Sequence, residues 1–176
     1  MKFERIDSRK VWEGKIATVR VDCFRYDDGG EAEREIVAHP GAVAVVAHDG
    51  ETLFLVRQPR EAINHPALLE LPAGKLDEEG EEPLDTAKRE LAEEIGKGAR
   101  TWHKLTSFYT SPGFADEECH VYLATDLFDQ RAEAVEHERI EIVEVPLSDL
   151  DHVIQECSDS KTLIGLLWIR AFSRSR

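Results

Sequence analysis

The sequence lacks the features of a membrane protein and of a disulfide-stabilised one. Its longest apolar stretch, Leu163 to Ile169, is far shorter than the roughly 20 residues that span a bilayer. The first ten residues contain no apolar segment of the kind found in secretory signals. The three cysteines stand far apart and form no C-x-x-C pair, which indicates reduced thiols. We therefore expect a cytoplasmic protein that does not contact membranes.

Basic residues are also scarce. The chain has 22 Lys and Arg against 36 Asp and Glu, which gives a formal net charge of −14. Such a surface repels nucleic-acid backbones, so a nucleic-acid partner is not expected. It would also repel a small phosphorylated substrate unless a cation or local arginines intervene. With 176 residues, of which 41 % are apolar, the chain is long enough for one stable core.

Turn residues divide the chain into short strands with interspersed helices. Strands are expected at residues 11–12, 16–26, 31–39, 42–47, 53–58, 68–71, 102–109, 120–124 and 140–145. Helices are expected at residues 83–95, 148–157 and 161–172, the second with Ser148 as its N-cap. This order predicts a mixed α/β or α+β layered fold. We expect a β-rich lobe at residues 1–40 and a catalytic domain at residues 41–176.

The helix expected at residues 83–95 carries an unusual acidic face. Pro83 suits its first turn and Gly96 its end, and apolar residues recur every three or four positions. Glu90, Glu93 and Glu94 fall together on a different face, where like charges repel each other. A solvated surface helix is one interpretation of this pattern. A divalent cation is the other, because Mg²⁺ takes carboxylate oxygens as ligands.

The context of this helix favours the cation. Residues 74–81 followed by residues 89–96, Arg-Glu-Leu-Ala-Glu-Glu-Ile-Gly, resemble the Nudix box, G-x5-E-x7-R-E-U-x-E-E-x-G-U, where U is apolar. Every fixed position from Glu81 to Gly96 agrees. Six residues instead of five separate Gly74 from Glu81, and Lys97 holds the last apolar position. The extra residue falls in a loop, where an insertion costs little. The resemblance implies a Nudix hydrolase with an α/β/α sandwich around a mixed sheet.

Further segments resemble the ADP-ribose pyrophosphatase branch of that family. They are residues 34–37 (REIV), 39–45 (HPGAVAV), Gln58 with Arg60, 70–74 (ELPAG) and 111–117 (SPGFADE). Pro112 stands some sixteen residues beyond the box, where the branch has a marker proline. The resemblance implies hydrolysis of ADP-ribose to AMP and ribose 5-phosphate. It also implies a homodimer that exchanges its N-terminal β-lobe.

The resemblance assigns the acidic helix to metal binding. Glu90 and Glu94 would be direct ligands, and Glu93 a further ligand or helper. The backbone oxygen of Ala73 would complete the set of metal ligands that the protein supplies. One to three Mg²⁺ ions are expected, with Mn²⁺ as the alternative metal.

The resemblance also implies catalytic roles outside the metal ligands. Arg89 would pair with Glu81 and orient the loop against the helix. The general base would be a loop glutamate, and Glu138 matches the family position best. Glu136 and Glu93 are the other candidates for the base.

Binding of an anionic substrate by an acidic protein should need arginines, and the candidates are Arg34, Arg57 and Arg60. Glu70 and Glu117 are further candidates for substrate binding. Arg60 matches the family position and would meet the phosphates or the terminal ribose. Arg57 is as readily explained as a surface charge.

The remaining candidates concern the nucleoside. Arg34 would reach the adenine side, and Glu117 would accept hydrogen bonds from ribose hydroxyls or join the metal shell. Phe24 or Tyr26 could stack on adenine, although ordinary strand packing explains both.

Two rival functions remain open from the sequence. The first keeps the chemistry and changes the substrate to GDP-mannose, a dinucleoside polyphosphate or NADH. The second is a Nudix domain that senses a nucleotide without turnover. Such domains commonly lose box glutamates, whereas this chain retains Glu81, Glu90, Glu93 and Glu94.

Overall fold

A computed structural model describes residues 1–130 and 139–173 of the chain. The chain divides into two compact units. The first consists of Met1–Gly41 and Phe108–Glu118, and the second of Ala42–Ser107 and Cys119–Arg176. The described residues form ten strands and three α-helices, so the expected mixed α/β class is confirmed. No helix among them is long and apolar enough to span a membrane.

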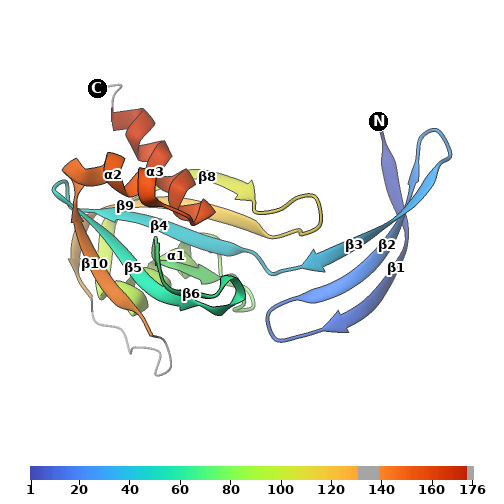
Figure 1. The fold of residues 1–176 in the computed structure, drawn as a ribbon, viewed down its shortest axis with the longest axis horizontal. Coiled ribbons are helices and arrows are strands. Elements are labelled where there is room, and N and C mark those ends of the chain that lie inside the picture. The colour runs from blue at the N-terminus through green and yellow to red at the C-terminus, as the bar shows by residue number, and fades with distance from the viewer. Residues whose placement is uncertain (131–138, 174–176) are drawn as a thin grey trace. The chain divides into compact units, whose positions relative to one another are not determined.

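The first unit is built on a three-stranded antiparallel sheet in the order β1-β2-β3 (Figure 1). Its strands are β1 (Phe3–Glu13), β2 (Thr18–Tyr26) and β3 (Glu31–Ala38). The expected turn joins β2 to β3, with Gly29 at a φ of 85° that favours glycine. β1 starts well before the strand predicted at residues 11–12. All of its residues are exposed, so the sequence carries no alternation of buried and exposed positions there.

A segment from much later in the chain completes the first unit. Val37 N–H donates to the Phe114 carbonyl at 2.8 Å, and Asp116 N–H donates to the Val37 carbonyl at 3.2 Å. The Asp116 carboxylate also accepts a hydrogen bond from His39 N–H at 2.9 Å. These bonds join residues 108–118 to the end of β3. The predicted division at residue 40, and the dimerisation role of the lobe, stay predictions.

The second unit holds a mixed seven-stranded sheet in the order β10-β5-β4-β9-β8, with β6 beside β5 and β7 beside β4. Its strands are β4 (Ala42–His48), β5 (Thr52–Arg60), β6 (His65–Glu70), β7 (Ala73–Lys75), β8 (Lys97–Tyr109), β9 (Glu118–Asp129) and β10 (Glu141–Pro146). β4 pairs in parallel with β9. It pairs antiparallel with β5 only at its end and with β7 at its start. β4 and β5 therefore splay apart, and β7 occupies the space beside β4.

Helices cover both faces of this sheet (Figure 1). They are α1 (Pro83–Ile95), α2 (Leu150–Glu156) and α3 (Ser160–Ser173). Side chains alternate along β4, as the pleat requires. Val43 and Val45 pack into one core cluster with Leu91 of α1, whereas Val46 packs against Gly165 of α3. The layered α/β/α arrangement expected from the sequence is therefore present in this unit.

The predicted cap of α2 is wrong. A 3₁₀ turn, Leu147–Asp149, precedes the helix, and Asp149 holds the N-cap position. The Ser148 hydroxyl donates to the Asp149 carboxylate at 3.2 Å instead of accepting from a helix N–H. The 3₁₀ turn therefore uses the backbone that the predicted first helical turn would have occupied.

Candidate active site

The helix α1 is positioned by its ends and by its apolar face. Pro83 lies in the first turn, where its missing N–H costs nothing. Gly96 ends the helix at a φ of 67°, and its N–H bonds to the Ala92 carbonyl at 3.1 Å. Leu91 and Ile95 are buried in the core beneath the sheet. This fixes the rotation of the helix and turns the carboxylates of Glu90 and Glu94 toward β7.

Arg89 is shared by three carboxylates. Its Nε and Nη2 contact the two oxygens of Glu81 at 3.3 and 3.1 Å, which is the pairing expected from the sequence. Its Nη1 contacts Glu90 at 2.9 Å and Glu93 at 3.2 Å. Hydrogen bonds from Arg89 hold the pKa of Glu81 below its ordinary value. One cation therefore ties the loop carboxylate to the acidic face of the helix.

Two carboxylates of α1 lie against the backbone of β7. The Ala73 N–H donates to Glu94 Oε2 at 3.0 Å. A Cβ atom added to Gly74 would lie 2.0 Å from Glu90 Oε1, so the carboxylate occupies the space that any other residue would fill. Only glycine permits this approach. Glu90 and Glu94 thus converge on two adjacent backbone residues, one of which is the predicted carbonyl ligand.

This donor set fits a hard divalent cation. It offers carboxylate oxygens and a backbone carbonyl, the ligands that Mg²⁺ and Mn²⁺ prefer. Within the part of the chain that the structure describes, no three acidic, histidine or cysteine side chains are arranged around a common point that could hold a metal. Glu90 and Glu93 instead turn toward Arg89. The residues fit the cation by type and by proximity to the Ala73–Gly74 backbone, and their partners include Arg89 and the Ala73 N–H.

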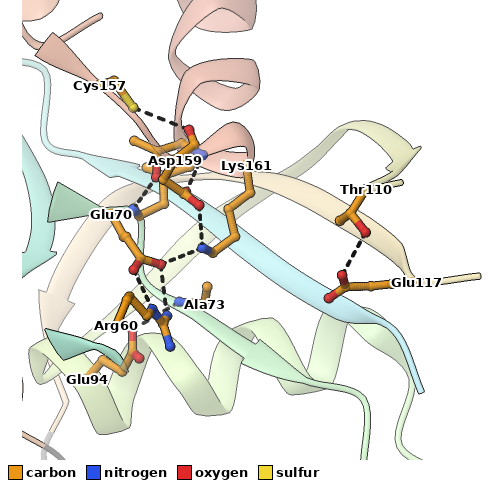
Figure 2. A network of polar contacts seen from close by, with 11 residues as sticks. Arg60, Glu70, Ala73, Glu94, Thr110, Glu117, Cys157, Asp159 and Lys161 are labelled. Carbon is orange, nitrogen blue, oxygen red and sulfur yellow. Dashed lines mark hydrogen bonds and ion pairs between the residues drawn. The ribbon is translucent and has the colours of Figure 1, made fainter. Parts of the chain in front are cut away.

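Arg60 and Glu70 are brought together beside this helix (Figure 2). Arg60 Nε donates to Glu70 Oε1 at 2.5 Å, and Arg60 Nη2 donates to Glu70 Oε2 at 2.8 Å. Glu70 has no exposed surface, whereas 40 % of the Arg60 side chain is exposed. The hydrogen bonds that Arg60 donates to Glu70 raise the pKa of Arg60, although burial opposes the shift. Glu70 is buried behind Arg60, and its part in substrate binding stays a prediction.

The same carboxylate binds a second cation, Lys161, which no sequence pattern indicated. Lys161 Nζ forms an ion pair with Glu70 and another, at 2.8 Å, with Asp159. Burial alone would lower the pKa of Lys161, but the charges of Asp159 and Glu70 outweigh it and raise the pKa. In the sequence, Lys161 stands out only because it and Asp159 lie at the start of an apolar helix. Its partner lies 91 residues away in the sequence.

Arg57 lies apart from this network. Its Nη1 contacts Glu141 of β10 at 3.3 Å, and both side chains are exposed. An exposed pair of this kind contributes little to stability. The contact matches the sequence interpretation of Arg57 as a surface charge, and its substrate role stays a prediction.

In the first unit, Arg34 lies in a pocket of about 300 Å³. Its Nη2 donates to the Tyr26 hydroxyl at 3.2 Å. Phe3 and Phe24 line the same pocket, with their rings edge to face and their centroids 5.5 Å apart. The pocket therefore combines a cation with aromatic faces, the surroundings that suit a nucleobase.

Glu117 also belongs to the first unit. Its Oε2 accepts a hydrogen bond from the Thr110 hydroxyl at 2.7 Å, as Figure 2 shows, and its Oε1 lies 3.4 Å from His39 Nδ1. The carboxylate is therefore held by local partners. Glu136 and Glu138, the loop candidates for the base, lie outside the described residues.

Comparison with known proteins matches residues 38–164 to the NUDIX domain. The chain is 41 % identical over 175 residues to an ADP-ribose pyrophosphatase of Bacillus subtilis, covering 97 % of this chain and 94 % of that protein. It is 39 % identical to the methanol dehydrogenase activator of Bacillus methanolicus, covering 94 % and 91 %. It is 44 % identical to an ADP-ribose pyrophosphatase of Mycobacterium tuberculosis, covering 80 % and 68 %.

A solved structure shares the fold. The crystal structure of an ADP compounds hydrolase superposes with a TM-score of 0.87 and covers 99 % of this chain and 96 % of that one. The two sequences are 22 % identical, so the likeness concerns the fold alone.

Proposed function

The chain belongs to the Nudix family of hydrolases, and on this premise we propose that it cleaves ADP-ribose with water to AMP and ribose 5-phosphate. The observation that carries the proposal is the approach of Glu90 and Glu94 to the Ala73–Gly74 backbone. Two relatives, 41 % and 44 % identical, that bear the name ADP-ribose pyrophosphatase support the choice of substrate.

Glu90, Glu94 and the Ala73 carbonyl would hold the divalent cation, with Glu93 as a further ligand or helper. We propose one to three ions of Mg²⁺, with Mn²⁺ as the alternative. Bound ions of this kind neutralise charge on diphosphate oxygens and lower the pKa of a bound water. Arg89 acts as a catalytic-site organiser, since its contacts with Glu81 hold the loop against α1.

Arg60 would contact the diphosphate. Two of its guanidinium nitrogens are occupied by Glu70. Among the described residues, its Nη1 has no hydrogen-bonding partner. An arginine held on one edge offers its other edge to an anion in a fixed orientation.

The nucleoside would be bound by the first unit. We propose that the pocket at Arg34 takes the adenine and that Glu117 accepts hydrogen bonds from a ribose. The aromatic lining of the pocket and the partly exposed carboxylate of Glu117 support these roles. For the base, Glu138 remains the first candidate by resemblance, with Glu136 and Glu93 next.

We further propose that the protein is a homodimer that uses residues 1–40. β1 exposes Phe3, Val11 and Trp12 by more than half of their surface. A three-stranded sheet needs a covered apolar face to be stable, and a second copy of the chain would supply it. The cellular location expected from the sequence remains the cytoplasm.

The reaction is tested by measuring AMP release from a panel of diphosphates. The panel contains ADP-ribose, GDP-mannose, NADH, diadenosine polyphosphates and nucleoside triphosphates, each with Mg²⁺ and with EDTA; GMP is followed for the guanosine compound. We expect EDTA-sensitive turnover with the highest kcat/KM for ADP-ribose. A preference for another member would keep the metal helix and reject the substrate assignment. Binding of ADP-ribose without turnover of any compound would favour a sensor.

A further inference from the structure

Glu70 is a buried carboxylate whose orientation is fixed from two sides. It has no exposed surface, and an unpaired carboxylate in such a place would cost several kcal/mol. Arg60 meets it from the exposed side through both carboxylate oxygens. Lys161 meets it from the inner side, with 19 % of its own side chain exposed. Figure 2 shows Glu70 between the two cations.

Lys161 is itself held in place by the start of α3. Asp159 uses one carboxylate oxygen for Lys161 at 2.8 Å. It uses the other to accept the N–H and the hydroxyl of Thr162 at 2.9 and 2.6 Å, which caps the helix. The Thr162 hydroxyl in turn accepts the N–H of Leu71, the residue after Glu70, at 2.8 Å. The network is therefore a closed connection between the end of β6 and the start of α3.

These contacts link Lys161 to the orientation of Arg60 through the shared Glu70 carboxylate. The last torsion of a glutamate side chain is soft, so a carboxylate held on one side only can rotate. Lys161 Nζ and Arg60 Nη2 both donate to Oε2 of Glu70. Lys161 therefore fixes the plane of the Glu70 carboxylate, with which the Arg60 guanidinium must align. We propose that Lys161 is a positioning residue for the reaction, acting through Glu70 to aim the free edge of Arg60 at the substrate diphosphate. The inference rests on the proposed contact between Arg60 and the diphosphate.

Lys161→Met removes the charge and the donor while keeping the length of the side chain. Arg60 would remain paired but would lose its fixed orientation. Loss of a contact that is equally strong in the ground state and the transition state raises KM and leaves kcat unchanged. We expect KM for ADP-ribose to rise about tenfold, kcat per folded molecule to change less than about threefold, and the Mg²⁺ dependence to stay unchanged.

Arg170→Met is the matched control. Arg170 is another cation of α3, and it pairs with Asp151 of α2 instead of Glu70. Its replacement should leave KM unchanged. If Lys161→Met lowers thermal stability and kcat while KM stays at the wild-type value, Lys161 is merely structural and the proposal is rejected.

A double-mutant cycle separates action through Arg60 from a general loosening of the site. Arg60→Lys keeps a cation beside Glu70 but removes the two-pronged contact. If Lys161 acts through that contact, Lys161→Met should change KM less than about twofold in the Arg60→Lys background. A full tenfold effect in both backgrounds would overturn the proposal.

Binding of a methylene analogue of ADP-ribose, with CH₂ in place of the bridging oxygen, distinguishes this inference from the proposed function. Its Kd is measured by calorimetry for wild type and Lys161→Met with Mg²⁺. Absence of ADP-ribose turnover by wild type, together with weaker analogue binding by the variant, would reject the reaction and support the positioning role. Equal Kd values, or no binding by wild type, would reject the positioning role.

Discussion

Asp22 is a buried carboxylate of the first unit, with 1 % of its side chain exposed. Burial alone would raise its pKa, but hydrogen bonds from Ser8, Arg20 and Arg5 outweigh burial and lower it. The folded state therefore binds fewer protons than the unfolded state below about pH 4, where an unfolded aspartate titrates. The stability that Asp22 contributes is complete above that pH. It is lost as the pH falls from there through the lowered pKa of the folded state.

Asp22→Asn should remove this pH dependence. At pH 7 we expect the variant to be less stable by about 1–3 kcal/mol, because the buried position loses its charge-assisted hydrogen bonds. The difference from wild type should shrink as the pH falls below about 4. The free energy of unfolding in urea, monitored by hydrogen exchange of β2 amides, is measured for both proteins at pH 7, 5 and 3. These values give the stability difference at pH 7 and its change with pH. A difference that stays constant over this range would show that Asp22 titrates normally.

The buried network shows how far single residues could be predicted. Arg60 and Glu70 were identified because they stand in segments that resemble a known branch of the family. Lys161 and Asp159 were not, because Lys161 matters through its contact with Glu70 across about half the chain, and Asp159 matters through its contact with Lys161. A lysine at a helix start is an ordinary surface residue in most sequences. Only the fold reveals that its Nζ is enclosed.

At the scale of elements, the approach of α1 to β7 depends on Gly74. A methyl group there would collide with the Glu90 carboxylate, which lies 2.0 Å from the position of the new Cβ. Glu90 would have to move away from the Gly74 backbone. Gly74→Ala should therefore lower kcat/KM by about 10- to 100-fold, in the range of a displaced metal-site group. Because the moving atoms end a flexible side chain, thermal stability should change little.

Gly96→Ala is the matched control on the same helix. The position has a φ of 67° and nothing near its would-be Cβ, so only the backbone is strained. We expect a loss of about 1 kcal/mol of stability with nearly normal kcat/KM. Steady-state kinetics and thermal unfolding of both variants provide the comparison. The account of Gly74 fails if Gly74→Ala retains wild-type kinetics.

Elements with a clear burial pattern could be predicted, and those without one could not. The spacing of apolar residues in α1, with Pro83 and Gly96 at its ends, specified the helix because one face meets the core. The continuous apolar run of β4 likewise reflects burial on both faces. β1 has exposed residues throughout, and β7 is three residues long, so neither leaves a periodic signal.

At the scale of the whole molecule, the acidic residues that produce the net charge of −14 are unevenly distributed. Glu81, Glu90 and Glu93 are gathered around one arginine, Arg89, and Glu94 of α1 contacts the backbone N–H of Ala73. This concentration explains how a protein that repels anions could accept a diphosphate, since a cation bound there would reverse the local charge. The sequence predicted the concentration because the box lies in one contiguous segment.

The central claim is that the α1 carboxylates beside Ala73 bind the cation that supports hydrolysis. Its most direct test is the rate of AMP formation from ADP-ribose by Glu94→Gln, with Mg²⁺ and beside wild type. The amide retains an oxygen for the Ala73 N–H but loses the charge, so the fold should persist. Glu82→Gln, an exposed position at the start of α1, is the control. We predict a loss of at least about 100-fold at unchanged metal-free thermal stability. Turnover close to wild type would contradict the account.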